Sequence, residues 1–272
     1  MIHREGTTGA VAKLIQQAVG AAIDGKWGPL TTAALKAWQS SQGLEPDGVA
    51  GPLTMAAIAA TQRVPGIDVS HWQGVIDWAS VANSGVRYCW VKAGQGNGGR
   101  DPCWLQNVRG CNEHQIPVGA YHFAVPDQRP DDPVAEAAHC AARMAGLQLE
   151  LPPVLDLELN GAKLAPADLE AWALAWLAEV ERLTGRRPIL YSSTHFLTKH
   201  AGGGQCLAAS GVRYWVARYR GGQHTDPGPL AAFKSWQIWQ YSCTGRVDGI
   251  KGNVDLNVLN GGHAELARLL EF

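Results

Sequence analysis

Up to residue 61, apolar positions recur every three or four residues, which is the spacing of one face of an amphipathic helix. The recurring positions fall into three groups: Val11, Leu14 and Ile15; Leu35 and Trp38; Met55 and Ile58. The pattern predicts three helices that share one small core, at about 9–22, 29–41 and 52–61. Pro29 and Pro52 begin the second and third of these helices, where a missing N–H costs no hydrogen bond.

After residue 65 the pattern changes to short apolar runs that alternate with amphipathic stretches. The runs with the length of strands are 66–69, 88–92, 118–123, 154–158, 189–191, 214–219 and 236–241. The helical stretches between them are near 78–83, 104–114, 133–144 and 166–183. Such alternation is typical of parallel β/α architecture. The stretch at 166–183 shows the clearest helical spacing, and it predicts that Trp172 and Trp176 are core residues rather than platforms for sugars.

The run from Pro153 to Leu159 has the length of a buried strand and carries two carboxylates, Asp156 and Glu158, among apolar residues. Residues i and i+2 of a strand point to the same face, so these side chains are expected to lie side by side. Burial raises the pKa of a carboxyl group, and a protonated acid beside an ionised carboxylate is a common catalytic pair. The alternative is a strand end that carries two hydrophilic residues into solvent.

Polar residues also stand near the ends of other predicted strands. They are Asp68, Lys92, Tyr121, His122 and Tyr191. In β/α barrels the carboxyl ends of the strands and the loops that follow them build the active site. With Asp156 and Glu158, five separate strands are therefore predicted to contribute to one mouth.

The overall composition is that of a globular protein with a large core. The 272 residues are 46% hydrophobic and carry a formal net charge of -1. This balance contains no basic excess, so nucleic acid and anionic membrane surfaces are not expected partners. No apolar run approaches the roughly 18 residues of a spanning helix, and the start lacks the pattern of a signal peptide. We expect neither membrane insertion nor signal-directed export.

Cysteine and histidine spacing gives no support to a metal or redox site. The six cysteines form no CxxC pair and the nine histidines no HExxH motif. We therefore predict no metal, no cofactor and cysteines that are mostly reduced. The glycine-rich segment 94–99 lacks both GxGxxG before a helix and GKS/T, so it is predicted to be a mobile loop and not a phosphate cradle.

A short repeat marks the N-terminal segment: DGKWGPLT at 24–31 recurs as DGVAGPLT at 47–54, offset by 23 residues (47 − 24). Each copy is predicted to be a tight Asp-Gly turn that leads into a helix. On these turns, residues 1–60 resemble the peptidoglycan-binding domain type 1 family. The resemblance implies a cell-wall anchor in which Asp24, Trp27, Asp47 and Thr54 line a shallow groove. As the alternative, the Asp and Thr side chains cap turns and helices, and Trp27 packs in the core.

Clustered carboxylates with abundant tryptophan and tyrosine favour glycoside hydrolysis, which uses carboxylates as acid and base and aromatic faces for sugar rings. Residues 66 to about 260 resemble the glycoside hydrolase family 25 lysozymes, an N-acetylmuramidase family with a (β/α)-type barrel. The segments that carry the resemblance are, in order, GIDVSHWQG (66–74), VKA (91–93), GAYHF (119–123), PVLDLE (153–158), YWVARY (214–219), WQY (239–241) and VDLN (254–257). One departure is AGQG (93–96), where many members have Thr and often Glu after the Lys-Ala pair.

The resemblance implies an α/β fold: an irregular, TIM-like (β/α) barrel at 66–272, a linker at 62–65 and a three-helix peptidoglycan-binding domain at 1–61. It also implies a carboxylate quartet for catalysis and a set of side chains that line the sugar groove. The quartet is Asp68, Asp156, Glu158 and Asp255. The groove residues are Lys92, Tyr121, Tyr191, Trp215, Tyr219 and Gln240.

Within the quartet, Glu158 is expected to be the general acid that protonates the glycosidic oxygen and later activates water, because negative neighbours raise its pKa. Asp156 is then expected to stay ionised. It either attacks the anomeric carbon or orients a substrate acetamido group that attacks instead, and we favour the second role. Asp68 and Asp255 are expected to tune charge and hold substrate hydroxyls, with a turn or cap role as the alternative.

The resemblance implies a monomeric peptidoglycan hydrolase that cleaves the β-1,4 bond between N-acetylmuramic acid and N-acetylglucosamine. A wall-binding domain joined to a muramidase without a signal peptide resembles a bacteriophage endolysin, held in the host cytoplasm until release to the wall in the periplasm. The alternatives are a bacterial wall-remodelling muramidase, a non-catalytic wall-binding protein on a hydrolase scaffold, and a hydrolase of another acetamido-sugar polymer such as chitin.

Overall fold

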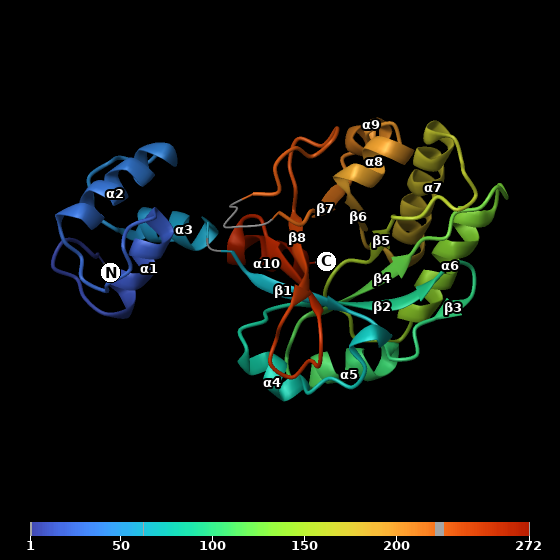
Figure 1. Ribbon diagram of the computed structural model, residues 1–272, viewed down its shortest axis with the longest axis horizontal. Helices are drawn as coiled ribbons and strands as arrows, with labels where there is room; N and C mark the ends of the chain where they lie inside the picture. The colour runs from blue at the N-terminus through green and yellow to red at the C-terminus, as the bar shows by residue number, and fades with distance from the viewer. Residues whose placement is uncertain (1, 62, 221–225, 272) are drawn as a thin grey trace. The chain divides into compact units, whose positions relative to one another are not determined.

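The computed structural model describes residues 2–61, 63–220 and 226–271 (Figure 1). Two compact units make up the chain. The first is Met1–Arg63 with Gly261–Glu265, and the second is Val64–Asn260 with Leu266–Phe272. Of the predicted linker at 62–65, residue 62 lies outside the described residues, and Val64 and Pro65 already belong to the second unit.

Three helices form the N-terminal unit: α1 (Ala10–Val19), α2 (Pro29–Ser41) and α3 (Pro52–Thr61). The predicted bounds of the second and third helices are confirmed. The first helix is shorter than its predicted range of 9–22, because Gly20 takes a left-handed conformation (φ 72°) and ends it. Ile15, Leu35 and Ile58, one from each helix, are buried together in the core.

The sequence repeat is also a repeat of hydrogen bonds. Gln16 Nε2 donates to Asp24 Oδ1 (2.7 Å) and Thr31 Oγ1 (3.1 Å). In the second copy, Gln39 Nε2 donates to Asp47 Oδ1 (2.8 Å) and Thr54 Oγ1 (3.0 Å). Each buried glutamine also accepts a backbone N–H of its turn through Oε1, at 2.9 Å. A buried amide that satisfies its donors and its acceptor in this way fixes one turn against two helices.

The second unit is a closed barrel. Its strands are β1 (Pro65–Val69), β2 (Cys89–Gln95), β3 (Gly99–Arg100), β4 (Val118–Phe123), β5 (Val154–Asp156), β6 (Ile189–Ser193), β7 (Arg213–Ala217), β8 (Ile238–Gly245) and β9 (Val254–Leu259). The order around the sheet is β1-β9-β8-β7-β6-β5-β4-β2-β3, and pairing of β1 with β2 closes a ring of eight strands that leaves out β3. Neighbours from β1 through β2 and β4 to β8 are parallel, whereas β9 is antiparallel to both β8 and β1. The predicted irregular TIM-like barrel is confirmed.

Alternation along the strands divides the apolar residues between two cores. Val154, Ile189 and Trp215 belong to a cluster that fills the barrel, where the Trp90 and Trp215 rings lie 4.9 Å apart. Their chain neighbours, such as Leu155, belong to a second cluster between the strands and the helices. Both faces of the sheet are thus buried, which explains why the strands read as continuous apolar runs.

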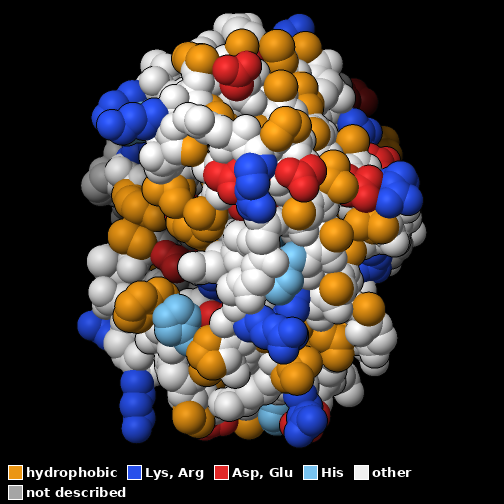
Figure 2. Space-filling view, turned by 90° about the vertical axis from the view of Figure 1, so that its right-hand side faces the viewer, with side chains coloured by type: hydrophobic (Ala, Val, Ile, Leu, Met, Phe, Trp, Pro, Cys, Tyr) orange, Lys and Arg blue, Asp and Glu red, His pale blue; other side chains and the backbone are white. Residues whose placement is uncertain are grey.

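Helices cover the outside of the barrel (Figure 1). After the 3₁₀ turn η1 (His71–Gln73) they are α4 (Trp78–Asn83), α5 (Trp104–Glu113), α6 (Asp132–Met144), α7 (Pro166–Thr184), α8 (Thr194–His200) and α9 (Gln205–Ala209). Helix α10 (Gly262–Leu270) follows β9, and its Leu269 packs in the cluster that fills the barrel. Trp172 and Trp176 on α7 are 5% and 0% exposed, so their prediction as core residues is confirmed. On the face shown in Figure 2, acidic and basic side chains lie next to one another without a patch of a single sign. None of the described helices is long and apolar enough to cross a membrane.

Several elements differ from the sequence prediction. Strand β5 ends at Asp156, so Glu158 lies beyond the strand in the following loop. The segment 94–99, predicted as a mobile loop, joins β2 to β3 in a hairpin in which Gln95 pairs with Gly99. Strand β9 and helices α8, α9 and α10 were not predicted, since these segments are short or mix polar and apolar residues.

Candidate active site

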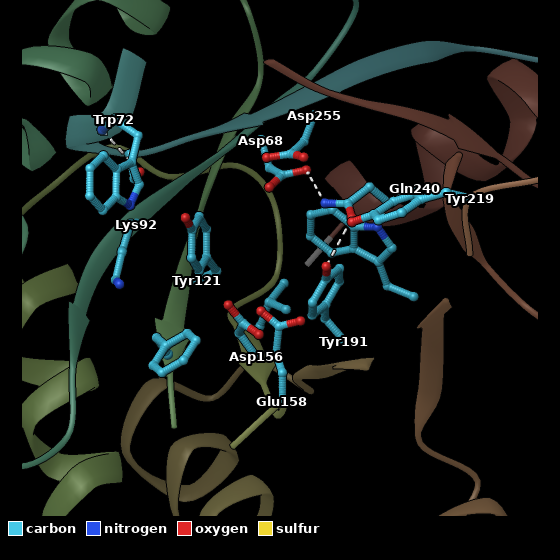
Figure 3. Close-up of a pocket in the computed structure, with 14 residues that line it drawn as sticks. Asp68, Trp72, Lys92, Tyr121, Asp156, Glu158, Tyr191, Tyr219, Gln240 and Asp255 are labelled. Carbon is cyan, nitrogen blue, oxygen red and sulfur yellow. Dashed lines mark hydrogen bonds between the residues drawn. The ribbon is translucent and has the colours of Figure 1, made fainter. Parts of the chain in front are cut away.

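One pocket of about 230 Å³ opens at the carboxyl ends of the parallel strands (Figure 3). Its walls are built from residues on β1, β2, β4, β5, β6, β7, β8 and β9 and from the loops that follow them. The lining residues are Asp68, Ser70, Trp72, Lys92, Tyr121, Phe123, Val154, Asp156, Glu158, Tyr191, Trp215, Tyr219, Gln240 and Asp255. All ten barrel residues predicted for the site are in this set.

Asp68 and Asp255 are direct cross-strand neighbours in the antiparallel pairing of β1 with β9. Opposed residues in such a pair share a face, so the two carboxyl groups lie together at one wall of the pocket (Figure 3). Burial, followed by the charges of Asp68 and Glu158, raises the pKa of Asp255 to about 8. Negative charges this close to Asp255 favour its protonated form.

Asp68 is the centre of a buried hydrogen-bond network. Its Oδ2 accepts Gln240 Nε2 at 2.9 Å and Asn257 Nδ2 at 2.8 Å. Burial raises the pKa of Asp68 to about 6, while these two donors act in the opposite direction. Asn257 in turn accepts the indole N–H of Trp215 through Oδ1, at 2.9 Å. The network holds the carboxylate in one orientation.

Gln240 links two tyrosines to that network. Its Oε1 accepts the hydroxyl of Tyr191 at 2.9 Å and the hydroxyl of Tyr219 at 2.6 Å, while its Nε2 donates to Asp68. The amide therefore fixes two rings of the pocket wall relative to the Asp68 carboxylate. Tyr219 is 52% exposed, so its ring offers a face to a ligand.

Asp156 and Glu158 lie side by side at the opposite wall (Figure 3). Asp156 is 7% exposed, and its Oδ1 has no hydrogen-bond partner among the described residues. Burial, followed by the charges of Glu158 and Asp68, raises the pKa of Asp156 well above the usual carboxyl range. Burial and the charge of Asp68 also raise the pKa of Glu158, whose residue is exposed at the rim. The expectation that Asp156 is the ionised member stays a prediction, and burial, which acts more strongly on Asp156 than on Glu158, opposes it.

Lys92 is the cationic side chain of the pocket. Burial lowers its pKa, while Asp156, Asp101 and Glu158 act in the opposite direction. Its Nζ donates to Gln95 Oε1 at 2.9 Å and lies 4.7 Å from the centre of the Phe123 ring. The positive charge of Lys92 lowers the pKa values of Asp156 and Glu158 and so opposes the effect of burial on them.

Four lining residues were not predicted: Ser70, Trp72, Phe123 and Val154. All four lie within or beside the segments on which the family resemblance rests, which is the signal that could have found them. Trp72 is 81% exposed and projects at the pocket edge. Conversely, His122 was expected at the mouth but is fully buried and contacts Glu136 at 2.8 Å, because Tyr121 beside it takes the inward face of β4.

The four residues predicted to bind the cell wall have structural roles in the N-terminal unit. Asp24 and Asp47 cap the turns described above, and both side chains are exposed. Trp27 and Thr54 are 3% and 5% exposed, in agreement with the alternative interpretation of both residues. Their part in wall binding stays a prediction, and Trp27 and Thr54 offer little surface for it.

The carboxyl groups that line the pocket can transfer protons to and from a bound ligand. Among the described residues no group of three or more His, Cys, Asp or Glu side chains is arranged to hold a metal ion. Paired carboxyl groups with raised pKa values supply an acid and a base, and aromatic rings supply faces for saccharides. The barrel and this site together define a glycoside hydrolase.

Comparison with known proteins gives the family. Residues 67–250 match the model for glycosyl hydrolases family 25, and residues 12–58 match the model described as "Putative peptidoglycan binding domain". The chain belongs to glycosyl hydrolases family 25 and carries an N-terminal domain of the peptidoglycan-binding type.

Similar proteins match about three quarters of this chain. Lysozyme M1 of Streptomyces globisporus is 35% identical over 208 residues, which are 74% of this chain and 69% of that protein. An N,O-diacetylmuramidase of Arthroderma benhamiae is 27% identical over 209 residues, 73% of this chain and 83% of that protein. The crystal structure of the bacterial lysozyme from Streptomyces coelicolor superposes with a TM-score of 0.69 and 34% identity, over 77% of this chain and 98% of that one.

Proposed function

We propose that this chain is a muramidase that cleaves the β-1,4 bond between N-acetylmuramic acid and N-acetylglucosamine in bacterial peptidoglycan. The observation that carries the proposal is the placement of Asp156 and Glu158 side by side in a pocket whose opposite wall holds Asp68 and Asp255 (Figure 3). The relatives named as a lysozyme and an N,O-diacetylmuramidase support the substrate, and the N-terminal peptidoglycan-binding domain supports it independently.

Glu158 is the general acid of the proposed reaction. It lies at the rim, where a glycosidic oxygen has access to it, and burial and the Asp68 charge raise its pKa, which favours the protonated form that a general acid needs. A negative charge on Glu158 raises the pKa of Asp156, so the loss of a proton from one carboxyl group makes its loss from the other less favourable.

Asp156 is the group that orients the substrate. Its buried Oδ1 has no hydrogen-bond partner among the described residues, and the acetamido N–H of the bound sugar supplies one in the proposal. This donor lowers the pKa of Asp156 and so favours its ionised form beside the protonated Glu158. Substrate binding thereby sets which carboxyl group is acid and which is base.

In the proposed reaction the acetamido carbonyl oxygen attacks the anomeric carbon as the glycosidic C–O bond breaks. The proton of Glu158 passes to the leaving oxygen, and Asp156 holds the acetamido N–H while the oxazoline ring forms. Water then opens that ring after Glu158 takes its proton, which restores both side chains. Direct attack by Asp156 on the anomeric carbon is the alternative, and it leaves a covalent glycosyl-enzyme that mass spectrometry detects.

The test of the proposed activity is Glu158→Gln assayed on purified peptidoglycan. The variant is isosteric, so it keeps the fold and the binding of sacculi, while release of new reducing ends falls by roughly 10²- to 10⁴-fold. Cleavage near the parent rate would remove Glu158 from the acid role. Absence of cleavage by the parent protein as well would favour a non-catalytic wall-binding protein.

We further propose that the chain acts as an endolysin, supplied to the wall from the host cytoplasm when the membrane is opened. The union of a wall-binding domain with a hydrolase in one chain supports this role. Cytoplasmic expression in a Gram-negative host should leave cells intact until chloroform opens the membrane, and lysis should then follow within minutes, with Glu158→Gln as the inactive control. Lysis of cells without chloroform treatment would favour a wall-remodelling enzyme with its own route of export.

A further inference from the structure

A second hollow adjoins the catalytic pocket at Glu158 and Tyr219. Its volume is about 590 Å³, and both residues line it as well as the pocket. It lies at the carboxyl ends of β6 and β7, where Ser193 and Ala217 are neighbours in the sheet. The lining residues are Glu158, Ser193, Thr194, His195, Thr198, Ala217, Arg218 and Tyr219. We call it the Arg218 hollow.

Glu158 thus separates two compartments of opposite character. The catalytic pocket contains four carboxyl groups and one lysine. Among the described residues that line the Arg218 hollow, Glu158 alone has a carboxyl group, and the other polar side chains are four hydroxyls, an imidazole and a guanidinium. The hydroxyls of Thr194, Thr198 and Tyr219 already donate within the protein, so the guanidinium and the imidazole are the main donors for a ligand. An anionic part of a substrate is therefore repelled by the first compartment and attracted by the second.

Arg218 is oriented but not neutralised. Its Nη1 donates to Pro229 O at 2.7 Å, and the guanidinium has no ion-pair partner among the described residues. A third hollow, near Asp127 and Lys163, also contains an arginine. There Arg129 is already bound to Asp127 (2.7 Å) and Asp132 (3.0 Å), so its charge is satisfied within the protein. Arg218 thus has no ion pair with a described residue for a ligand carboxylate to displace, whereas Arg129 has two.

We propose that the Arg218 hollow binds the leaving-group side of the glycan strand, where N-acetylglucosamine comes first and N-acetylmuramic acid second. In this proposal Arg218 and His195 bind a carboxylate of the peptide stem that this second sugar carries. The inference rests on the proposed function, because it takes Glu158 as the acid that stands between the two halves of the cleaved strand. The acid donates its proton to an oxygen at the border of the two compartments, which places one sugar in the pocket and the next one over the hollow.

The test compares two soluble glycan strands of equal length, one with free stem carboxylates and one in which these are converted to amides. The parent protein should cleave the free-carboxylate strand with a kcat/KM roughly tenfold higher, the value of one charged hydrogen-bond pair. Arg218→Gln and His195→Ala should lose that preference and cleave both strands equally. Lys199→Ala, which removes a positive charge on the same helix outside the hollow, should keep it.

Equal cleavage of both strands by the parent protein would overturn the inference, as would a preference retained by both variants. The His195 imidazole is exposed and makes no hydrogen bond to another described residue, so His195→Ala decides the question if Arg218→Gln fails to fold. Failure of the parent to cleave either strand would instead refute the proposed function itself, and the two failures are thus distinguishable.

Discussion

The pKa values of two aspartates in the N-terminal unit and two in the barrel pocket are shifted in opposite directions. Asp24 and Asp47 are exposed, and hydrogen bonds from a glutamine and from backbone N–H groups lower their pKa values. Asp68 and Asp255 lie in the pocket, and burial raises their pKa values to about 6 and about 8. The first pair stabilises turns as charged groups, whereas burial disfavours the charged form of the second pair.

This difference gives a physical criterion for telling a structural carboxylate from a candidate catalytic one. A structural carboxylate has donors for its oxygens and gains from being charged. Asp156 has a buried oxygen without a partner, which costs stability unless a ligand supplies the donor. Repeated Asp-Gly turns and the DxE segment look equally prominent in the sequence, but only the second places its carboxyl groups in a pocket.

The largest effect is expected from Asp156→Asn. The variant keeps the size of the side chain and removes the charge that the acetamido group requires, so kcat should fall by roughly 10²- to 10⁴-fold. Thermal unfolding should stay near the parent midpoint, because an amide of the same size replaces a carboxyl group whose Oδ1 makes no hydrogen bond to a described residue. Asp24→Asn is the matched control on an exposed, structural aspartate, and full activity on soluble glycan is expected for it.

A smaller effect is expected when the N-terminal unit is removed. The lysozyme from Streptomyces coelicolor is matched over 98% of its length by 77% of this chain, so the barrel is complete without the first unit. Residues 65–272 should cleave soluble fragments at the parent rate but bind intact sacculi roughly tenfold more weakly. Equal sedimentation of both proteins with sacculi would contradict a wall-binding role for the first unit.

Asp68→Asn should shift the pH profile of kcat/KM. The charge of Asp68 raises the pKa of Glu158, and activity that needs protonated Glu158 is lost as pH rises through that pKa. Removing the charge lowers the pKa, so the alkaline limb should move to lower pH by about one unit in the residual activity. An unmoved alkaline limb would assign it to another group.

The two sets of aspartates should also give stability of opposite pH dependence. Asp255 has a folded pKa of about 8, above its unfolded value, so the folded state binds the extra proton and its stability falls as pH rises from about 4 to 8. The lowered pKa values of Asp24 and Asp47 instead give stability that is lost as pH falls below their unfolded values. Denaturant unfolding between pH 5 and 8 should show a flatter dependence for Asp255→Asn than for the parent.

Much of the barrel could be predicted from the sequence because its strands are apolar on both faces. Strand β9 escaped prediction, since Asp255 and Asn257 interrupt its apolar residues and read as a loop. The family resemblance identified Asp255, but no pattern in the chain indicates that Asn257 is fully buried and bound to Asp68. A polar residue that serves a buried network looks like a surface residue until the strand pairing is known.

The pairing of Asp156 with Glu158 was predicted from strand alternation, yet the strand ends at the first of the two. The side chains meet because the following loop continues toward the pocket, which local sequence does not encode. The Arg218 hollow lay outside the prediction for a related reason. Apart from the predicted Glu158 and Tyr219, its residues come from the ends of β6 and β7, from the position after β7 and from the short helix α8, and no sequence motif groups them.

The central claim is tested most directly by mass spectrometry of purified peptidoglycan digested with this protein and reduced with borohydride. The account predicts that the new reducing ends are N-acetylmuramitol and that Glu158→Gln produces roughly 10²- to 10⁴-fold fewer of them. Reduced N-acetylglucosamine ends would contradict it, because the barrel would then cleave the other glycosidic bond of the strand. Intact glycan strands would contradict it more deeply, because the four carboxyl groups of the pocket would then carry out no hydrolysis of this polymer.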